Sequence, residues 1–261
     1  MAEFFGFGGY QRPAEGFLSW QHLTFVTLVM LIMVIQAVYW GSKNNSRSEE
    51  DKNKVIMFSA FLMDGVELFK IIIICIRGND PMAWLYHLPL FVCSIQMITL
   101  PLAAFSKGRI RQASLDFICM FGLIGAILGT YGAGNNYSCY PVLSLENVVS
   151  AITHGTAGFA ALYILIAGMT RMRKENLGIT FAILLGFVGV AYTANVILDY
   201  NYMFLVRGDG TPYDILYNWV GGNPILYPIG VVGLFVIYIL AFYKVFALVQ
   251  SKKKKPVVSE A

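Results

Sequence analysis

A histidine, a proline and a cysteine stand close together in one apolar run, residues 84–96, which reads WLYHLPLFVCSIQ. A cysteine in apolar surroundings is inert unless a base or a cation favours its thiolate, which is the nucleophilic form. His87 precedes Cys93 by six residues, which in a regular helix is about 240° around the axis and about 9 Å along it. We therefore expect any base for Cys93 to come from another helix.

The elements that would position this run are long apolar segments. The chain has 261 residues, of which 57% are hydrophobic and 13% are charged, so it is far more apolar than a soluble domain of this size. Helices of roughly 20 residues cross the hydrocarbon core of a membrane. The sequence predicts an all-α polytopic membrane protein with seven transmembrane helices, near residues 20–40, 55–76, 83–105, 113–132, 148–170, 178–204 and 225–249.

Basic residues predict the orientation of the chain. Fifteen of the 19 Lys and Arg residues fall in alternate loops and in the C-terminal tail, and such loops are cytoplasmic. We therefore expect an extracytoplasmic segment 1–19, a transmembrane domain 20–249 with the N-terminus outside, and a basic cytoplasmic tail 250–261. We expect a multi-pass protein of the bacterial plasma membrane. The net charge of +4 is a topology signal and does not indicate nucleic acid.

The second predicted helix carries three ionisable residues, Asp64, Glu67 and Lys70. Their spacing places them along one face, which must meet protein or a wet cavity because charges in lipid are costly. Two interpretations are open. The residues form an ion cluster that fixes helix packing, or Glu67 orients a catalytic histidine or binds a polar head group.

Polar groups from different helices are predicted to lie at similar depth. Glu67, Cys93, His154 and Asn195 each lie roughly six to ten residues from the predicted outer end of their helix. This predicts a site in the outer half of the bundle, where His154 is the best-placed base for Cys93. A histidine in a membrane helix also commonly bonds a backbone carbonyl, and Gly125 and Gly129, a GxxxG pair, indicate close helix packing.

Further polar residues are candidates for binding or orienting a substrate. His22 follows Trp20 at the outer interface, where both are also typical of an anchor. Asn195 and Asp199 share one helix face. The full candidate set for these roles is His87, Glu67, Asn195, Asp199, His22, Gln96 and Asn201. No metal-binding or phosphate-cradling motif occurs, so we expect no metal and no cofactor. The oligomeric state stays open.

Two of these stretches carry a family resemblance. His87-Leu88-Pro89-Leu90-Phe91-Val92-Cys93 resembles the H-L-P-L-x-x-C signature of the YwaF/TMEM164-like membrane proteins, and residues 201–205, NYMFL, resemble the motif that closes their sixth helix. The resemblance includes His22, Glu67, His154 and the number of helices, over about residues 20–245. It is looser after residue 205.

The resemblance implies an activity. Animal members of the family are lipid acyltransferases that use a cysteine, which implies Cys93 as nucleophile and His154 as its base. The expected partners are membrane lipids that donate and accept a fatty-acyl chain. Two other hypotheses remain. One is a binding or transport protein with a substrate or proton path lined by Asp64, Glu67, Lys70, His87 and Asp199. The other is a scaffold whose buried polar groups only specify helix packing.

Overall fold

The computed structural model describes residues 2–253, and every regular element in this part of the chain is a helix. The prediction of an all-α fold is confirmed. The chain divides into two compact units, Met1–Thr170 and Arg171–Ala261. Of the predicted basic tail, residues 254–261 lie outside the described residues.

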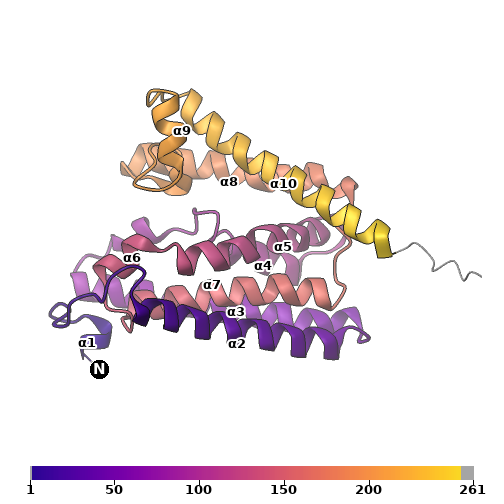
Figure 1. Ribbon diagram of the computed structural model, residues 1–261, viewed down its shortest axis with the longest axis horizontal. Coiled ribbons are helices and arrows are strands. Elements are labelled where there is room, and N and C mark those ends of the chain that lie inside the picture. The colour runs from indigo at the N-terminus through magenta and orange to yellow at the C-terminus, as the bar shows by residue number, and fades with distance from the viewer. Residues whose placement is uncertain (1, 254–261) are drawn as a thin grey trace, which may run out of the picture. The chain divides into compact units, whose positions relative to one another are not determined.

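The first unit is built around one central helix. α7 (Leu145–Ile166) packs against α5 (Gly108–Tyr131), α2 (Trp20–Asn44) and α3 (Glu49–Gly78), and in Figure 1 these long helices run alongside one another. α4 (Gln96–Phe105) packs against α3 and α5. Short elements complete this unit: α1 (Ala2–Phe5), the 3₁₀ helix η1 (Ala83–His87) and α6 (Gly134–Cys139).

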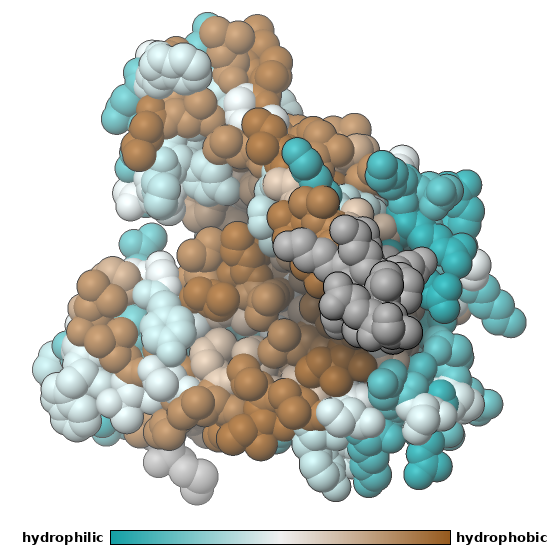
Figure 2. All heavy atoms as spheres, turned by 45° about the vertical axis from the view of Figure 1, so that its right-hand side comes forward, coloured by the Kyte–Doolittle hydropathy of each residue, from teal (hydrophilic) through white to brown (hydrophobic). Residues whose placement is uncertain are grey.

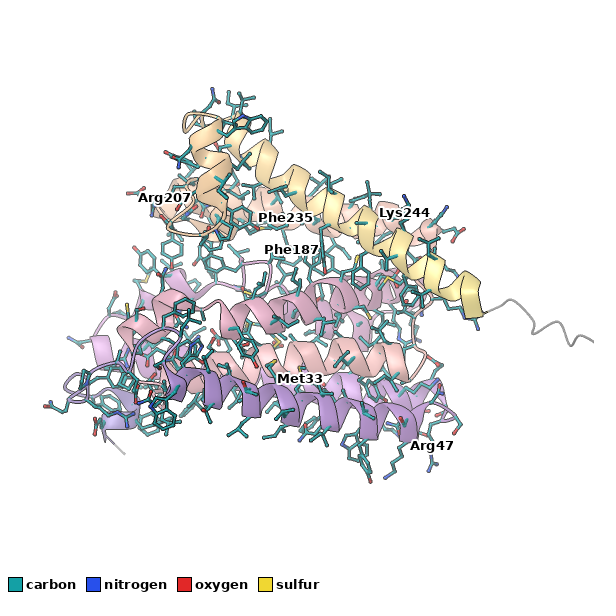
Figure 3. All side chains as sticks on the ribbon, viewed as in Figure 1. Met33, Arg47, Phe187, Arg207, Phe235 and Lys244 are labelled. Atoms are coloured by element: carbon teal, nitrogen blue, oxygen red, sulfur yellow. The ribbon has the colours of Figure 1, made fainter. Side chains whose placement is uncertain are left out.

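Small residues let the helices approach α7 closely. A Cβ on Gly158 of α7 would lie 2.4 Å from the Met33 sulfur of α2 and 2.7 Å from Ala126 of α5. Figure 3 labels Met33 on α2. A Cβ on Gly122 of α5 would lie 2.7 Å from the Ala157 carbonyl oxygen. Glycine at these positions gives the backbone contact on which helix association in membranes depends.

Five helical segments in the described part of the chain are long and apolar enough to cross a membrane. They are Trp20–Asn44, Gly108–Cys139, Leu145–Ile166, Lys174–Leu198 and Leu226–Val249. Their outer surfaces are apolar as well. On α2, for example, Leu31, Ile32 and Ile35 are all exposed, and Figure 2 shows hydrophobic side chains on the flanks of the helices. A surface of this kind suits lipid, because water would exclude it.

The prediction of a continuous helix over residues 83–105 is wrong. η1 ends at His87, residues 88–95 are turns and extended chain, and α4 begins only at Gln96. Pro89 is the cause, because the residue before a proline is sterically pushed out of the α region. Leu88 accordingly has φ −61° and ψ 147°. Ser94 then closes the turn, since its hydroxyl accepts from the Phe91 N–H and donates to the Phe91 carbonyl.

The remaining predicted span, 55–76, lies inside α3, a single 30-residue helix. This helix carries the ionisable residues Asp64, Glu67 and Lys70, and so it differs in composition from the five apolar segments. Its start is capped by Ser48, whose hydroxyl accepts from the Asp51 N–H at 3.1 Å. Such a cap satisfies one of the free donors of the first turn.

The second unit consists of η2 (Lys174–Asn176), α8 (Leu177–Leu198), η3 (Tyr202–Phe204), α9 (Tyr213–Trp219) and α10 (Leu226–Lys253). α9 packs on α10, where Tyr213 and Phe235 meet edge to face with ring centroids 6.3 Å apart. Figure 3 shows Arg207 and Lys244 near opposite ends of this unit. Arg207 lies in the loop between η3 and α9, and Lys244 lies in the second half of α10.

Candidate functional site

Cys93 lies in the turn that leads into α4, and not within a helix. The Ile95 N–H donates to the Phe91 carbonyl at 2.9 Å, so residues 91–95 already form one helical turn. The backbone N–H groups of Cys93 and Ser94 lie near the cysteine sulfur. Backbone donors at the start of a helix favour negative charge, which suits a thiolate.

The structure brings Cys93 and His154 together. The thiol and the imidazole lie within hydrogen-bonding reach of each other, although they come from the α4 turn and from the middle of α7. The other ring nitrogen of His154, Nδ1, lies 2.7 Å from the Ser150 carbonyl oxygen. A carbonyl only accepts, so Nδ1 carries the proton and Nε2 keeps its lone pair. His154 is therefore in the tautomer that can take a proton from a thiol.

Two glycines of α5 make room for this pair. A Cβ on Gly129 would lie 2.0 Å from Cδ2 and Nε2 of His154, and a Cβ on Gly125 would lie 3.4 Å from the Cβ of Cys93. The two glycines are one turn apart, so they lie on the same face of α5, and this face packs against the imidazole and the thiol. The GxxxG pair, predicted to serve helix packing, lies directly against the Cys93–His154 pair.

Glu67 and Lys70 form an ion pair on α3. The Lys70 ammonium donates to the Glu67 carboxylate at 2.5 Å, and each side chain is 13% exposed. The Glu67 charge also acts on His154, and both charges act on His87 at the end of η1. The Glu67–Lys70 pair is therefore close enough to interact electrostatically with His154 and His87. The two charges also neutralise each other, as the packing interpretation requires.

His22 and Gln96 are both fully buried, but they do different things. The His22 Nδ1 accepts from the Leu18 N–H at 3.1 Å, and its Nε2 lies 3.1 Å from the Thr130 carbonyl oxygen. His22 thus ties the start of α2 to the end of α5, next to Gly129. Gln96 begins α4, and its Oε1 accepts from the Thr99 hydroxyl at 2.8 Å.

A charged cluster ties the N-terminal segment to the helix ends. Arg77, from the end of α3, donates to Glu146 at the start of α7 over 2.5 Å and to the Phe5 carbonyl over 3.0 Å. The Tyr10 hydroxyl donates to the same Glu146 carboxylate. Burial, assisted by this hydrogen bond and the Glu146 charge, raises the pKa of Tyr10 to about 12. The cluster fixes the end of α7 that lies two turns before His154.

Asn195, Asp199 and Asn201 belong to the second unit, where two of them shape the turn after α8. The Asn195 amide donates to the Tyr202 carbonyl at 3.0 Å and its oxygen accepts from the Tyr202 N–H at 2.5 Å. Asp199 ends the helix in the left-handed conformation, with φ 49°. Asn201 donates to the Arg207 carbonyl and to Asp209, at 2.7 and 2.8 Å. The side chains of Asn195 and Asn201 therefore stabilise the fold of residues 201–205, NYMFL.

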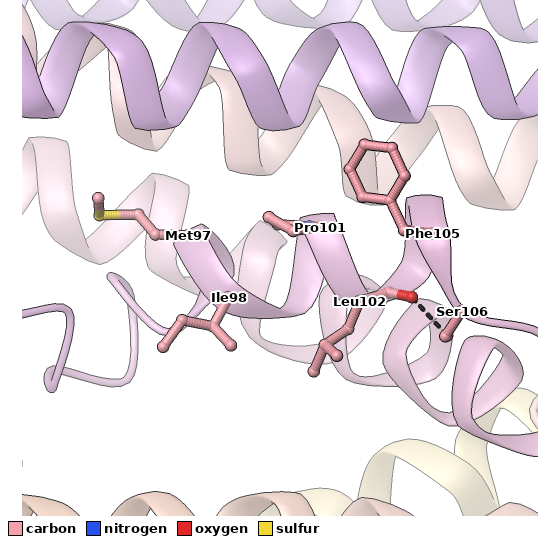
Figure 4. Close-up of a pocket in the computed structure, with 6 residues that line it drawn as sticks. All are labelled: Met97, Ile98, Pro101, Leu102, Phe105 and Ser106. Carbon is pink, nitrogen blue, oxygen red and sulfur yellow. Dashed lines mark hydrogen bonds between the residues drawn. The ribbon is translucent and has the colours of Figure 1, made fainter.

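An open apolar hollow of about 500 Å³ runs along α4 (Figure 4). It begins at Met97, four residues after Cys93, and ends at Phe105 and Ser106. Ile98, Pro101 and Leu102 complete its lining. This surface has the chemistry to accept an alkyl chain, because it offers carbon atoms and almost no hydrogen-bonding groups.

Sequence reasoning missed several residues that structure the site. Ser150 precedes His154 by one turn, and this i,i+4 spacing was the available signal for its carbonyl contact. The role of Gly125 and Gly129 had no local signal beyond their spacing, because it depends on what packs against α5. Thr99 likewise matters only through its contact with Gln96.

The described residues contain no group of three or more His, Cys, Asp or Glu side chains placed to hold a metal ion. The four cysteines are free thiols, and only Cys119 among them is buried. Cys119 donates to the Ala161 carbonyl over 3.7 Å. Cys93, in contrast, has the imidazole of His154 beside it.

Fold and site together define an integral membrane protein of packed apolar helices with a cysteine and a histidine in contact inside the first unit. A model of the TMEM164 family matches residues 17–249, so the chain belongs to the TMEM164 family, as the motifs predicted. No curated protein and no solved structure matches the chain.

Proposed function

We propose that this protein is a membrane-embedded acyltransferase, in which Cys93 is the nucleophile and His154 is the base. One observation carries the proposal: the thiol of Cys93 and the imidazole of His154 lie within hydrogen-bonding reach, with Nδ1 held by the Ser150 carbonyl. A thiol, a base and a group that orients the base are the parts that covalent catalysis by cysteine requires.

The chemistry follows from these positions. Nε2 of His154 takes the thiol proton, and the sulfur attacks the carbonyl carbon of a fatty-acyl ester or thioester. The leaving group departs with the proton from the imidazolium, and the acyl chain remains on Cys93 as a thioester. A lipid hydroxyl then loses its proton to His154, attacks the thioester and releases the thiolate, which regains the proton. We propose a phospholipid or lysophospholipid as the acceptor.

The membrane setting supports lipid substrates. We propose seven passes, the five apolar segments together with α3 and the broken 83–105 stretch, with the N-terminus outside and the basic tail in the cytoplasm of a bacterial cell. The hollow along α4 begins at Met97, four residues after Cys93 in the chain, and it would receive the acyl chain of a substrate whose carbonyl group reacts at Cys93. The mechanism uses only side chains of this protein, and it needs no cofactor.

The test is acylation of the purified protein in detergent. Incubation with a fatty-acyl p-nitrophenyl ester should release p-nitrophenol and add one acyl mass to the peptide that contains Cys93. Cys93→Ala should abolish both signals. Cys75→Ala, which removes another partly exposed free thiol, is the matched control and should keep both. Acylation that persists in Cys93→Ala would refute the proposal.

The buried carboxylate of Asp64 favours a second function, which is binding or transport through a polar path. Asp64 of α3 has a buried carboxylate oxygen, Oδ1, without a hydrogen-bond partner among the described residues. An unpaired carboxylate within a membrane helix is typical of proton or ion pathways. Under this function, Asp64→Asn would stop substrate uptake into proteoliposomes, whereas Cys93→Ala would leave it unchanged.

A further inference from the structure

Gln96 has a buried amide that is only half satisfied. The residue is fully buried, and its Oε1 accepts from the Thr99 hydroxyl at 2.8 Å. Its Nε2, in contrast, is buried without a hydrogen-bond partner among the described residues. Leaving an amide donor unpaired in this way costs stability, and native proteins rarely keep such a group without a use for it.

The position of Gln96 relates it to Cys93. Gln96 is the first residue of α4 and follows Cys93 by three residues. The Ile95 N–H donates to the Phe91 carbonyl and the Met97 N–H donates to the Ser94 carbonyl, so residues 91–97 form consecutive turns that lead into α4. The first and fourth residues of a turn lie within about 7 Å of each other at Cα, so Gln96 lies close to Cys93 along the chain.

Asn195, another candidate amide for contacting a substrate, makes its hydrogen bonds elsewhere. Asn195 uses its side-chain nitrogen and oxygen on the backbone of Tyr202. In Gln96 the oxygen accepts from the Thr99 hydroxyl, so the atom without a partner among the described residues is the donor nitrogen. A donor held in place by a neighbour, and not yet bonded, is the arrangement that stabilises developing negative charge at low reorganisation cost.

We propose that the Gln96 side chain donates a hydrogen bond to the oxyanion that forms when Cys93 attacks an acyl carbonyl. This inference rests on the proposed acyltransferase function. As the C–S bond forms, the carbonyl π electrons move to oxygen, and Nε2–H of Gln96 donates a hydrogen bond to that negative charge. When the carbonyl reforms, the leaving group departs and Gln96 is again free.

The test compares two reactions of the same thiol. Acylation by a fatty-acyl p-nitrophenyl ester passes through an oxyanion, whereas alkylation by iodoacetamide displaces iodide and forms none. Gln96→Leu should lower the acylation rate of Cys93 by about 100- to 1,000-fold, as loss of an oxyanion donor does, and change the alkylation rate less than about 3-fold.

Two further variants sharpen the result. Gln96→Glu keeps the shape of the side chain but replaces the NH₂ donor by an acceptor, so it should lose acylation as Gln96→Leu does. Gln36→Leu makes the same change on the exposed face of α2 and should leave both rates unchanged.

The outcomes separate this inference from the proposed function. If the wild-type protein acylates at Cys93 and Gln96→Leu acylates equally fast, the inference fails alone. If acylation and alkylation fall together in the variant, Gln96 positions the thiol and the inference is again overturned. If the wild-type protein is never acylated at Cys93, both proposals fail.

Discussion

The protonation pattern of His154 is determined by a backbone atom. Because Nδ1 donates to the Ser150 carbonyl at 2.7 Å, the more distant Ser150 hydroxyl, at 3.3 Å, is a secondary contact. In proteins where a carboxylate orients the base, removing that side chain destroys the tautomer. Here the orienting group remains whatever residue occupies position 150.

This leads to a prediction about Ser150. Ser150→Ala keeps the carbonyl and should retain acylation of Cys93 within about 3-fold of the wild-type rate. His154→Gln, which removes the base, should lower it by at least about 100-fold. Acylation rates of the two variants, measured beside the wild type, check both statements. A loss in Ser150→Ala as large as in His154→Gln would mean that the hydroxyl orients the ring.

At the scale of a single element, helix α5 contributes to the site by leaving space for other side chains. The imidazole of His154 packs against Gly129, and Cys93 packs against Gly125. The sequence correctly indicated a close approach at this GxxxG pair, but the partner is a functional side chain as well as a helix backbone. A glycine at position 129 is therefore a requirement of the site.

Substitution of this glycine should misplace the base. In Gly129→Ala the new Cβ would lie 2.0 Å from the ring, so the imidazole must move by more than 1 Å to restore a normal contact. A shift of this size costs about 100-fold in rate, and we expect that loss in acylation.

The controls for Gly129 are other glycines of the same unit. Gly125→Ala places its Cβ at 3.4 Å from Cys93, an ordinary contact, and should lose less than about 10-fold. Gly65→Ala in α3 meets nothing within 4 Å, so it should keep full activity and gain slightly in helix stability. Equal acylation rates in Gly129→Ala and Gly65→Ala would show that the space beside Gly129 is not needed to position His154.

At the level of the whole molecule, the Arg77–Glu146–Tyr10 cluster connects three distant parts of the chain. It joins the N-terminal segment, the end of α3 and the start of α7. The Glu146 side chain is 9% exposed and that of Arg77 is 20% exposed, so loss of either partner leaves a charge with little solvent. The cluster therefore stabilises the end of the bundle from which α7 runs to His154.

Glu146→Ala should destabilise the folded state by about 3 kcal/mol, the cost of removing one partner from a largely buried ion pair. The thermal midpoint in detergent measures this loss. Lys54→Gln breaks an exposed ion pair, in which Lys54 lies 2.9 Å from Asp51 with 64% of its side chain exposed. This control should cost less than about 1 kcal/mol, and equal losses in the two variants would contradict the prediction.

The cluster also predicts a dependence on alkaline pH. Folding raises the pKa of Tyr10 from 10.0 to about 12, so between these values the unfolded chain loses this proton first. The contribution of Tyr10 to stability is complete below pH 10 and falls as pH rises toward 12. The thermal midpoint of Tyr10→Phe should decline less steeply over this interval than that of the wild type. Parallel declines would contradict the prediction.

Much of the fold was predictable because its signals are local. Neighbouring residues in the sequence reveal the long apolar segments, the row of ionisable residues on α3 and the basic loops. The predictions of an all-helical fold and of the family are confirmed. The continuous helix over 83–105 was a wrong prediction, because its apolar composition outweighed the effect of Pro89 on Leu88. The seven passes and their orientation stay predictions.

The sequence by itself determined that this is a membrane protein of apolar helices, and it supplied a thiol and an imidazole at similar predicted depth. Only the tertiary structure decided that Cys93 meets His154, that glycines of α5 lie against them, and that the Gln96 nitrogen has no partner in the described part of the chain. The physical reason is that composition and periodicity act over a few residues. Contacts between side chains 61 positions apart depend on how whole helices pack.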